Sequence, residues 1–173
     1  LRHMSTCRFG CAGQSLYEDL DVLVGGLPAS LRLLRLDLGF TSLRSLGRLS
    51  SLAAPSLAHV SLRLTGSALE TVQGLEVLAT LPIRRLELWL LSLPLRDLAP
   101  LTIVLPALDL EELTLSVSHC PDLAPASVRE LRAAARRLKR RRGRQLTMWL
   151  DLQDIRLCLM IGVERTHNTT STR

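Results

Sequence analysis

The sequence predicts an α/β fold in which short parallel β-strands alternate with helical or irregular segments along a repeating array. Three observations predict it. Leucine fills 42 of the 173 positions, whereas aromatic residues make up only 3% of the chain. Five runs of alternating apolar and polar residues recur at nearly constant spacing, and helix-start signals fall between them. A chain of this length suits a single structural unit.

The five alternating runs have the two-residue period of a β-strand, which places their leucines on one face and their polar residues on the other. The runs begin at Leu34, Val60, Leu86, Leu113 and Leu146, so successive offsets are 26, 26, 27 and 33 residues. The longer last spacing contains a basic insertion. We therefore expect about five strands that lie side by side and point the same way.

Helix starts are predicted between the runs by three capping boxes, in which a serine is followed three residues later by a glutamate. The boxes begin at Ser15, Ser67 and Ser127. Apolar stripes at helical spacing follow the last two boxes, and their members are Leu69, Val72, Leu75 and Leu78 in one and Val128, Leu131, Ala135 and Leu138 in the other. Residues 41–55 and 92–106 have weaker helical patterns, so we expect only a turn or two there.

Both ends of the array need covers, because an uncovered terminal strand is prone to pairing with another chain. Residues 15–25 are predicted to cover the first repeat. Residues 155–163 alternate cleanly and predict a further strand against the last repeat.

Four of the runs follow a leucine-like residue at a fixed distance, which gives the pattern L-x-x-L-x-L. The matches are residues 31–36, 57–62, 83–88 and 110–115. This pattern resembles the leucine-rich repeat family over residues 15–152, and the helical connections are most similar to its ribonuclease-inhibitor-like, intracellular type. The family usually places Asn or Cys a few residues after the strand. The first three repeats have neither, and His119-Cys120 is the nearest substitute after the fourth. The resemblance therefore implies a degenerate array.

The resemblance implies a right-handed α/β solenoid of about five repeats. We place this leucine-rich repeat domain, with its terminal caps, at residues 15–163. Residues 1–14 are predicted to be a flexible N-terminal segment and residues 164–173 a disordered tail.

Parallel strands in a solenoid present their polar positions as columns on one concave surface, which is the default binding site. The first predicted column is Arg35, Ser61, Glu87, Thr114 and Thr147, and the second is Asp37, Arg63, Trp89, Ser116 and Trp149. Tryptophan is enriched at interface hot spots. We predict that the protein-binding residues are Arg35, Asp37, Arg63, Glu87, Trp89 and Trp149. Packing beneath a terminal element is the alternative for Trp149.

The net charge of +6 is concentrated in one segment. Residues 129–144 hold nine cations and one acid, a local charge of +8 that leaves −2 for the rest of the chain. Such a run has three explanations, which are a solvated convex surface, contact with an acidic protein partner and contact with RNA phosphates. No RNA-reading aromatic motif accompanies it. The predicted contacts to an anionic partner are Arg129, Arg132, Arg136, Arg137, Lys139, Arg140, Arg141 and Arg142.

Catalytic and metal-binding motifs are absent from the sequence. It has no Gly-rich phosphate loop, H-E-x-x-H, paired C-x-x-C or G-x-S-x-G. We therefore predict no enzymatic activity, catalytic residue, cofactor, metal site or small-molecule substrate. A metal site formed by His119, Cys120 and Cys158 is disfavoured, because adjacent residues in a bend seldom converge on one ion.

The longest stretch without a charged residue is the 14 residues of 49–62, short of the roughly 18 that a membrane-spanning helix needs. We predict no membrane span. The four widely spaced cysteines favour reduced thiols in an intracellular protein, with the cytoplasm favoured and an organelle left open. No secretory signal peptide is predicted. The start at Leu1, with no acid before Glu18, fits an added tag, a fragment boundary or the remains of an organellar presequence.

Together these features predict a non-catalytic protein–protein interaction module, a scaffold or adaptor within a larger complex. The alternative is a structural subunit of a ribonucleoprotein assembly that contacts RNA through the basic helix of residues 129–144. Steep salt dependence of RNA binding would favour the alternative.

Overall fold

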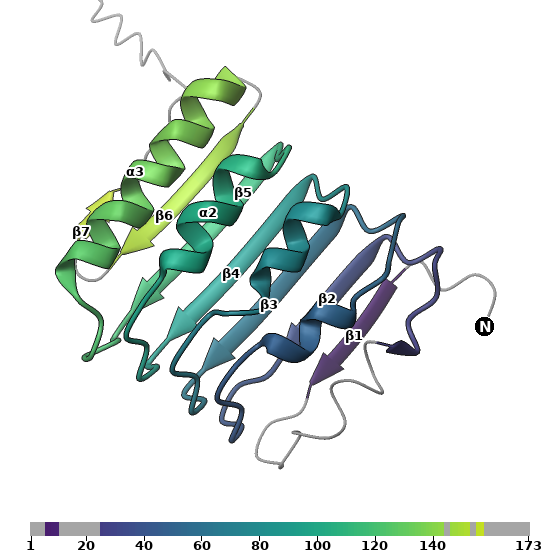
Figure 1. The fold of residues 1–173 in the computed structure, drawn as a ribbon, viewed down its shortest axis with the longest axis horizontal. Helices are drawn as coiled ribbons and strands as arrows, with labels where there is room; N and C mark the ends of the chain where they lie inside the picture. Colours follow the sequence, from purple (N-terminus) through teal and green to yellow (C-terminus); the bar gives the residue numbers. More distant parts are fainter. Residues whose placement is uncertain (1–5, 11–24, 144–145, 153–154, 158–173) are drawn as a thin grey trace, which may run out of the picture.

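A computed structural model describes residues 6–10, 25–143, 146–152 and 155–157 of the chain. Seven strands form one sheet in chain order (Figure 1). The strands are β1 Thr6–Gly10, β2 Leu33–Asp37, β3 His59–Thr65, β4 Arg85–Leu91, β5 Glu112–Ser118, β6 Thr147–Leu152 and β7 Ile155–Leu157. Strands β1 to β6 are parallel to their neighbours, and β7 pairs antiparallel with β6. The predicted side-by-side parallel arrangement of the leucine runs is confirmed.

Four helical segments in the described chain connect the strands and lie over one face of the sheet (Figure 1). They are the 3-10 helices η1 Gly47–Ser51 and η2 Leu75–Thr80 and the α-helices α2 Ala99–Ala107 and α3 Pro125–Arg142. None of these segments covers the opposite side of the sheet, which we call the open face. No helix in the described residues combines the length and the apolar character that crossing a membrane requires.

The core lies between the sheet and the helical segments and consists almost entirely of leucine. Strand residues that point toward the helices, such as Leu34, Leu62 and Leu88, are at most 1% exposed. The strand register stacks Leu34, Val60, Leu86 and Leu113 in one row. Full burial of one leucine contributes about 1.5–3 kcal/mol, so a core with few aromatic residues is still stable when many leucines stack.

The last parallel strand differs in register from the prediction. Leu113 pairs with Met148 rather than with Leu146, so the register of β6 is shifted by two residues from the one that the alternating pattern indicates. The backbone N–H of Thr147 donates to the carbonyl of Glu111 at 2.8 Å. The ammonium of Lys139 donates to the carbonyl of Leu146. Leu146 is buried just before the strand starts. Because these contacts fix the register, the true offset from the preceding repeat is 35 residues.

The N-terminal segment also differs from the prediction. The sequence predicts a flexible segment at residues 1–14, but Thr6–Gly10 form β1, which pairs in parallel with β2. The sheet therefore has six parallel strands instead of about five. At the other end, β7 agrees with the predicted terminal strand for residues 155–157. The predicted cap at 15–24, the rest of the terminal strand and the tail at 164–173 lie outside the described residues.

Neither described capping box forms. The backbone N–H groups of Ala68 and Glu70 donate to Thr41 and Arg44 of the preceding repeat, so this stretch is extended and the helical turn starts only at Leu75. In α3 the residue before the helix is Ala124, and Ser127 lies inside the first turn. Helix α2 is longer than expected because Pro100 occupies a first-turn position, where a missing N–H costs nothing.

Each of the strands β2 to β5 is followed by the same backbone turn. Phe40, Gly66, Ser92 and His119 all have left-handed φ angles, between 54° and 62°. Each stands three residues after an aligned position of the sheet. The next residue is buried in every case, and these residues are Thr41, Ser67, Leu93 and Cys120. The turn therefore repeats with the strand spacing even though its residue types do not.

Candidate interaction surface

Two columns of outward-facing residues run across the open face. The first is Arg35, Ser61, Glu87, Thr114 and Trp149, and the second is Asp37, Arg63, Trp89, Ser116 and Asp151. Because β6 is shifted by two residues, Trp149 belongs to the first column and not to the predicted second one. Thr147 leaves the columns and aligns with Glu112. Asp151 joins the surface, and only the correct register of β6 identifies it.

The two tryptophans meet although they stand on strands that are not adjacent. The ring centroids of Trp89 on β4 and Trp149 on β6 are 5.7 Å apart, with planes tilted by 36°. The strand between them, β5, presents Thr114 and Ser116 to the same face. Ser116 is only 2% exposed although it faces outward. We infer that these small side chains let the two rings close over β5.

A cation extends the aromatic pair toward β3. The guanidinium carbon of Arg63 lies 5.7 Å from the centroid of the Trp89 ring, within the range of a cation–π contact. Arg63, Trp89 and Trp149 thus form a continuous array across four strands, which we call the Arg63–Trp89–Trp149 row. It brings together three of the six predicted protein-binding residues.

Glu87, next to this row, is held by three side chains. The hydroxyl of Ser61 donates to its carboxylate at 2.8 Å, and Nε2 of His59 lies 3.2 Å from it. The guanidinium of Arg35 is 4.0 Å away. Ser61 is fully buried beneath this cluster. The hydroxyl of Ser61 donates to the carboxylate of Glu87 and not to His59, so His59 does not act as a base toward this serine. The cluster is therefore suited to stabilising the fold.

Two nitrogen atoms in this region have no hydrogen-bond partner among the described residues. They are Nε1 of Trp89 and Nε of Arg35, and both atoms are buried. A buried donor without an acceptor costs about 1–3 kcal/mol. The predicted residue Asp37 is exposed and accepts the backbone N–H of Gly39 at 3.3 Å. It lies beside Arg63 in the second column.

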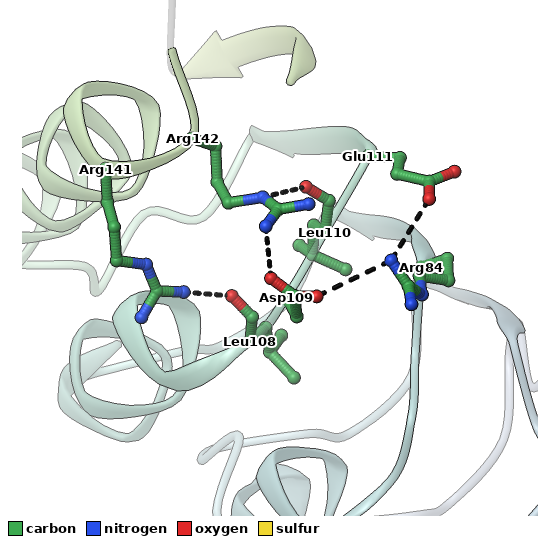
Figure 2. A network of polar contacts seen from close by, with 7 residues as sticks. All are labelled: Arg84, Leu108, Asp109, Leu110, Glu111, Arg141 and Arg142. Atoms are coloured by element: carbon green, nitrogen blue, oxygen red, sulfur yellow. Dashed lines mark hydrogen bonds and ion pairs between the residues drawn. The ribbon is translucent and has the colours of Figure 1, made fainter. Parts of the chain in front are cut away.

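The predicted anionic-partner residues divide into two groups. Three of them donate hydrogen bonds to backbone carbonyls of the protein. Lys139 donates to the carbonyl of Leu146, Arg141 donates to that of Leu108, and Arg142 donates to that of Leu110 at 3.1 Å. In the structure these three side chains attach the end of α3 to the connection before β5 and to the start of β6, and Figure 2 shows the contacts of Arg141 and Arg142. That they also contact an anionic partner stays a prediction.

Asp109 links this attachment to the neighbouring repeat. Its carboxylate accepts from Arg142 on one side and lies 3.5 Å from the guanidinium of Arg84 on the other (Figure 2). Arg84 also pairs with Glu111 at 3.2 Å. A pocket of about 490 Å³ adjoins these residues and is lined by Arg84, Glu111, Glu112, Arg142 and Thr147. The charged side chains that line this pocket form ion pairs with each other or with neighbouring residues. None of them is left unpaired to bind a charged ligand.

The remaining basic residues face away from the sheet. Arg129, Arg136, Arg137 and Arg140 are exposed, and Arg132 is half-buried. The buried side of α3 consists of Leu131, Ala134, Ala135 and Leu138. These five arginines are the predicted residues that stay available for an anionic partner.

The described residues contain no group of three or more His, Cys, Asp or Glu side chains arranged to hold a metal ion. His119 is exposed, and its Nδ1 lies 3.3 Å from the hydroxyl of Ser118. Cys120 is buried, with its sulfur 3.7 Å from the carbonyl of Leu90. Burial raises the pKa of the Cys120 thiol above its usual range, although a backbone hydrogen bond from Leu93 opposes this. Cys158 lies outside the described residues.

Comparisons with protein-family models, with curated proteins and with solved structures give no match to this chain.

Proposed function

We propose that the chain is a short solenoid of the leucine-rich repeat type and acts as a non-catalytic protein-interaction module. It binds its partner on the open face and serves as a scaffold or adaptor within a larger complex. The observation that carries this proposal is the Arg63–Trp89–Trp149 row, which lies on a sheet face that no described helix covers.

The repeat interpretation is supported by features that the sequence motif does not contain. The left-handed residue after each strand recurs every 26 or 27 residues, from Phe40 to His119. The buried position next to it is occupied by Thr41, Ser67 and Cys120 in three of four turns. These small side chains stand where the family usually has Asn or Cys, and only Cys120 matches that expectation by residue type.

The Arg63–Trp89–Trp149 row has the properties of an interface centre. Tryptophan and arginine dominate binding energies because they combine a large contact area with hydrogen-bond donors. The buried Nε1 of Trp89 has no acceptor within the described residues, and a carbonyl of the partner would satisfy it after a small ring movement. The row is bordered by two acids, Asp37 and Asp151. The partner would thus place an apolar or aromatic side chain on the rings, an acid near Arg63 and basic groups near the two aspartates.

A photo-crosslinking experiment tests the proposal. A photoreactive residue is introduced at Asp37, which is exposed beside Arg63 on the open face, and in a second protein at Ile103, which is 71% exposed on α2. We expect the Asp37 probe to capture a partner from the native source that the Ile103 probe does not capture. Capture from Ile103 alone would contradict the proposed surface.

Substitutions then test whether the captured partner binds to the Arg63–Trp89–Trp149 row. Trp89→Ala is expected to weaken binding about 30-fold or more, the size of a hot-spot effect of about 2 kcal/mol. The matched control is Phe40→Ala, which removes an aromatic side chain that is 67% exposed outside the row. Thermal melting of both variants separates binding from folding. Unchanged binding in a Trp89→Ala, Trp149→Ala double variant would overturn the proposal.

A further inference from the structure

Three arginines form a straight line along the outer side of α3. Arg129, Arg136 and Arg140 are separated by seven and four residues, which places them within about 20° of one line along an α-helix. At 1.5 Å per residue the line is about 16 Å long. The buried residues Leu131 and Leu138 lie on the opposite side. The line therefore stands at the point of the helix furthest from the sheet.

The charges in this line have no counterpart in the described part of the protein. Arg129, Arg136, Arg137 and Arg140 form no ion pair or hydrogen bond there, in contrast to Arg142 with Asp109. Like charges four residues apart, such as Arg136 and Arg140, destabilise a helix. Arg140 lies in the last turn, where the helix dipole favours a cation. Arg129 and Arg136 lie outside the terminal turns and gain no such stabilisation.

The chemistry of arginine fits one class of ligand. All five of these cations are arginine, as are 21 of the 22 Lys and Arg residues of the chain, so the fit rests on guanidinium geometry and not on a choice of arginine over lysine in this helix. A guanidinium binds phosphate oxygens through two parallel hydrogen bonds. A linear array of such groups matches a linear array of phosphates, which a nucleic-acid strand provides about every 3.4 Å along a duplex axis.

We propose that the outer side of α3, with Arg129, Arg136 and Arg140 in line and Arg132 and Arg137 beside them, binds the phosphate backbone of nucleic acid. Helix α3 has no aromatic residue on which a base could stack, so binding is independent of base sequence. The site lies on the opposite side of the sheet from the Arg63–Trp89–Trp149 row (Figure 1). One molecule can therefore hold a protein and a nucleic acid at once, as a structural subunit of a ribonucleoprotein assembly does.

The test measures fluorescence anisotropy of a labelled 20-nucleotide oligouridylate with the full chain between 20 and 200 mM salt. Five phosphate contacts on a single strand predict a slope of about −3.5 for the logarithm of the association constant against that of salt. Substituting Arg129, Arg136 and Arg140 by Gln is expected to reduce the slope to about −1.4 and the affinity several hundredfold at 50 mM salt.

The matched control changes the same number of charges elsewhere. Arg32, Arg44 and Arg96 are exposed residues outside α3, and their triple Gln variant has the same net charge as the helix variant. We expect it to keep the slope of the unmodified protein. A second helix variant, with Lys at the three α3 positions, keeps the charge and is expected to keep the slope while losing part of the affinity.

Several outcomes would overturn the proposal. They are an equal loss in the helix variant and its matched control, unchanged binding in the helix variant, or no binding to oligouridylate at 20 mM salt. Tighter binding to polyglutamate than to oligouridylate would assign the site to an acidic protein. Parallel titrations with duplex DNA of random sequence show whether single-stranded RNA or any nucleic acid is bound. Crosslinking from Asp37 reports separately on the open face, so each proposal can fail alone.

Discussion

A β-carbon on Gly74 would lie 2.1 Å from the carbonyl oxygen of Leu46, a distance at which the two atoms would overlap. Gly74 has a φ of 103°, which side chains also disfavour. The backbone N–H of Leu46 donates to the carbonyl of Gln73 at 3.2 Å. The connection between β2 and β3 thus touches the connection between β3 and β4 through the backbone, before the helical turn at Leu75 begins. This contact sets how closely η1 and η2 pack.

Gly74→Ala is therefore expected to lower the free energy of unfolding by about 2–5 kcal/mol, because both the φ angle and the clash oppose the new side chain. Urea denaturation measures the loss. The control is Gly25→Ala, since a β-carbon on Gly25 meets none of the described residues within 4 Å. That change should stay within about 0.5 kcal/mol of the unmodified protein. Equal stability of the two variants would refute the proposed backbone contact.

The contrast between the expected and observed role of Ser67 shows where local sequence signals fail. The serine–glutamate spacing is a valid capping box, but Ala68 and Glu70 already donate their N–H groups to the preceding repeat. Hydrogen bonds to the preceding connection thus replace the hydrogen bonds of a local helix cap. Strand positions were predictable because alternating leucines must be buried on one side, and that requirement does not depend on details of the loops.

Ser67→Ala distinguishes the two roles. The Ser67 hydroxyl is buried without a hydrogen-bond partner in the described residues, so its removal should leave stability unchanged or raise it by up to about 1 kcal/mol. A helix cap would instead lose about 1 kcal/mol. Thr41→Ala, at the equivalent turn position, is the comparison. The Thr41 hydroxyl donates to the carbonyl of Leu38 at 3.0 Å, so that variant should lose about 1 kcal/mol in the same urea titration.

The candidate site shows the same limit of local patterns. Arg63 and Trp89 occupy the predicted column, because β3 and β4 are separated by the regular 26 residues. Trp149 follows a basic insertion, and its column depends on where β6 starts. Contacts of Lys139 and Thr147 with backbone carbonyls determine that start, and an alternating pattern does not record them. The ring contact between Trp89 and Trp149 also needs a small residue on β5. It therefore depends on three strands together, and the pattern of a single strand does not reveal it.

The cluster around Glu87 makes a prediction about coupling. Glu87→Ala leaves the buried hydroxyl of Ser61 without its acceptor and should cost about 1–3 kcal/mol of unfolding free energy. Removing both groups, in Ser61→Ala with Glu87→Ala, should cost less than the sum of the single changes by at least about 0.5 kcal/mol. The double-mutant cycle is measured by urea denaturation. Strict additivity would mean that the hydrogen bond between them contributes nothing.

Cys120 makes the stability of the protein depend on pH above neutrality. Burial raises the pKa of its thiol, so the folded state retains this proton at pH values where the unfolded chain loses it. The unfolded state then binds fewer protons, and the free energy of unfolding falls as pH rises above about 8.5. The contribution of the Cys120 thiol to the free energy of unfolding is complete below about pH 8.5. It decreases as the pH rises toward the raised pKa of the thiol in the folded state.

The loss caused by Cys120→Ala should therefore be largest at pH 7 and smaller at pH 10, measured by urea denaturation under reducing conditions. The difference grows by no more than about 1.4 kcal/mol for each pH unit above 8.5. Leu93→Ala, at the equivalent turn position, removes a buried side chain that cannot ionise and should cost the same at both pH values. A Cys120→Ala loss that is constant with pH would show that the thiol ionises as readily in the folded protein as in the unfolded chain.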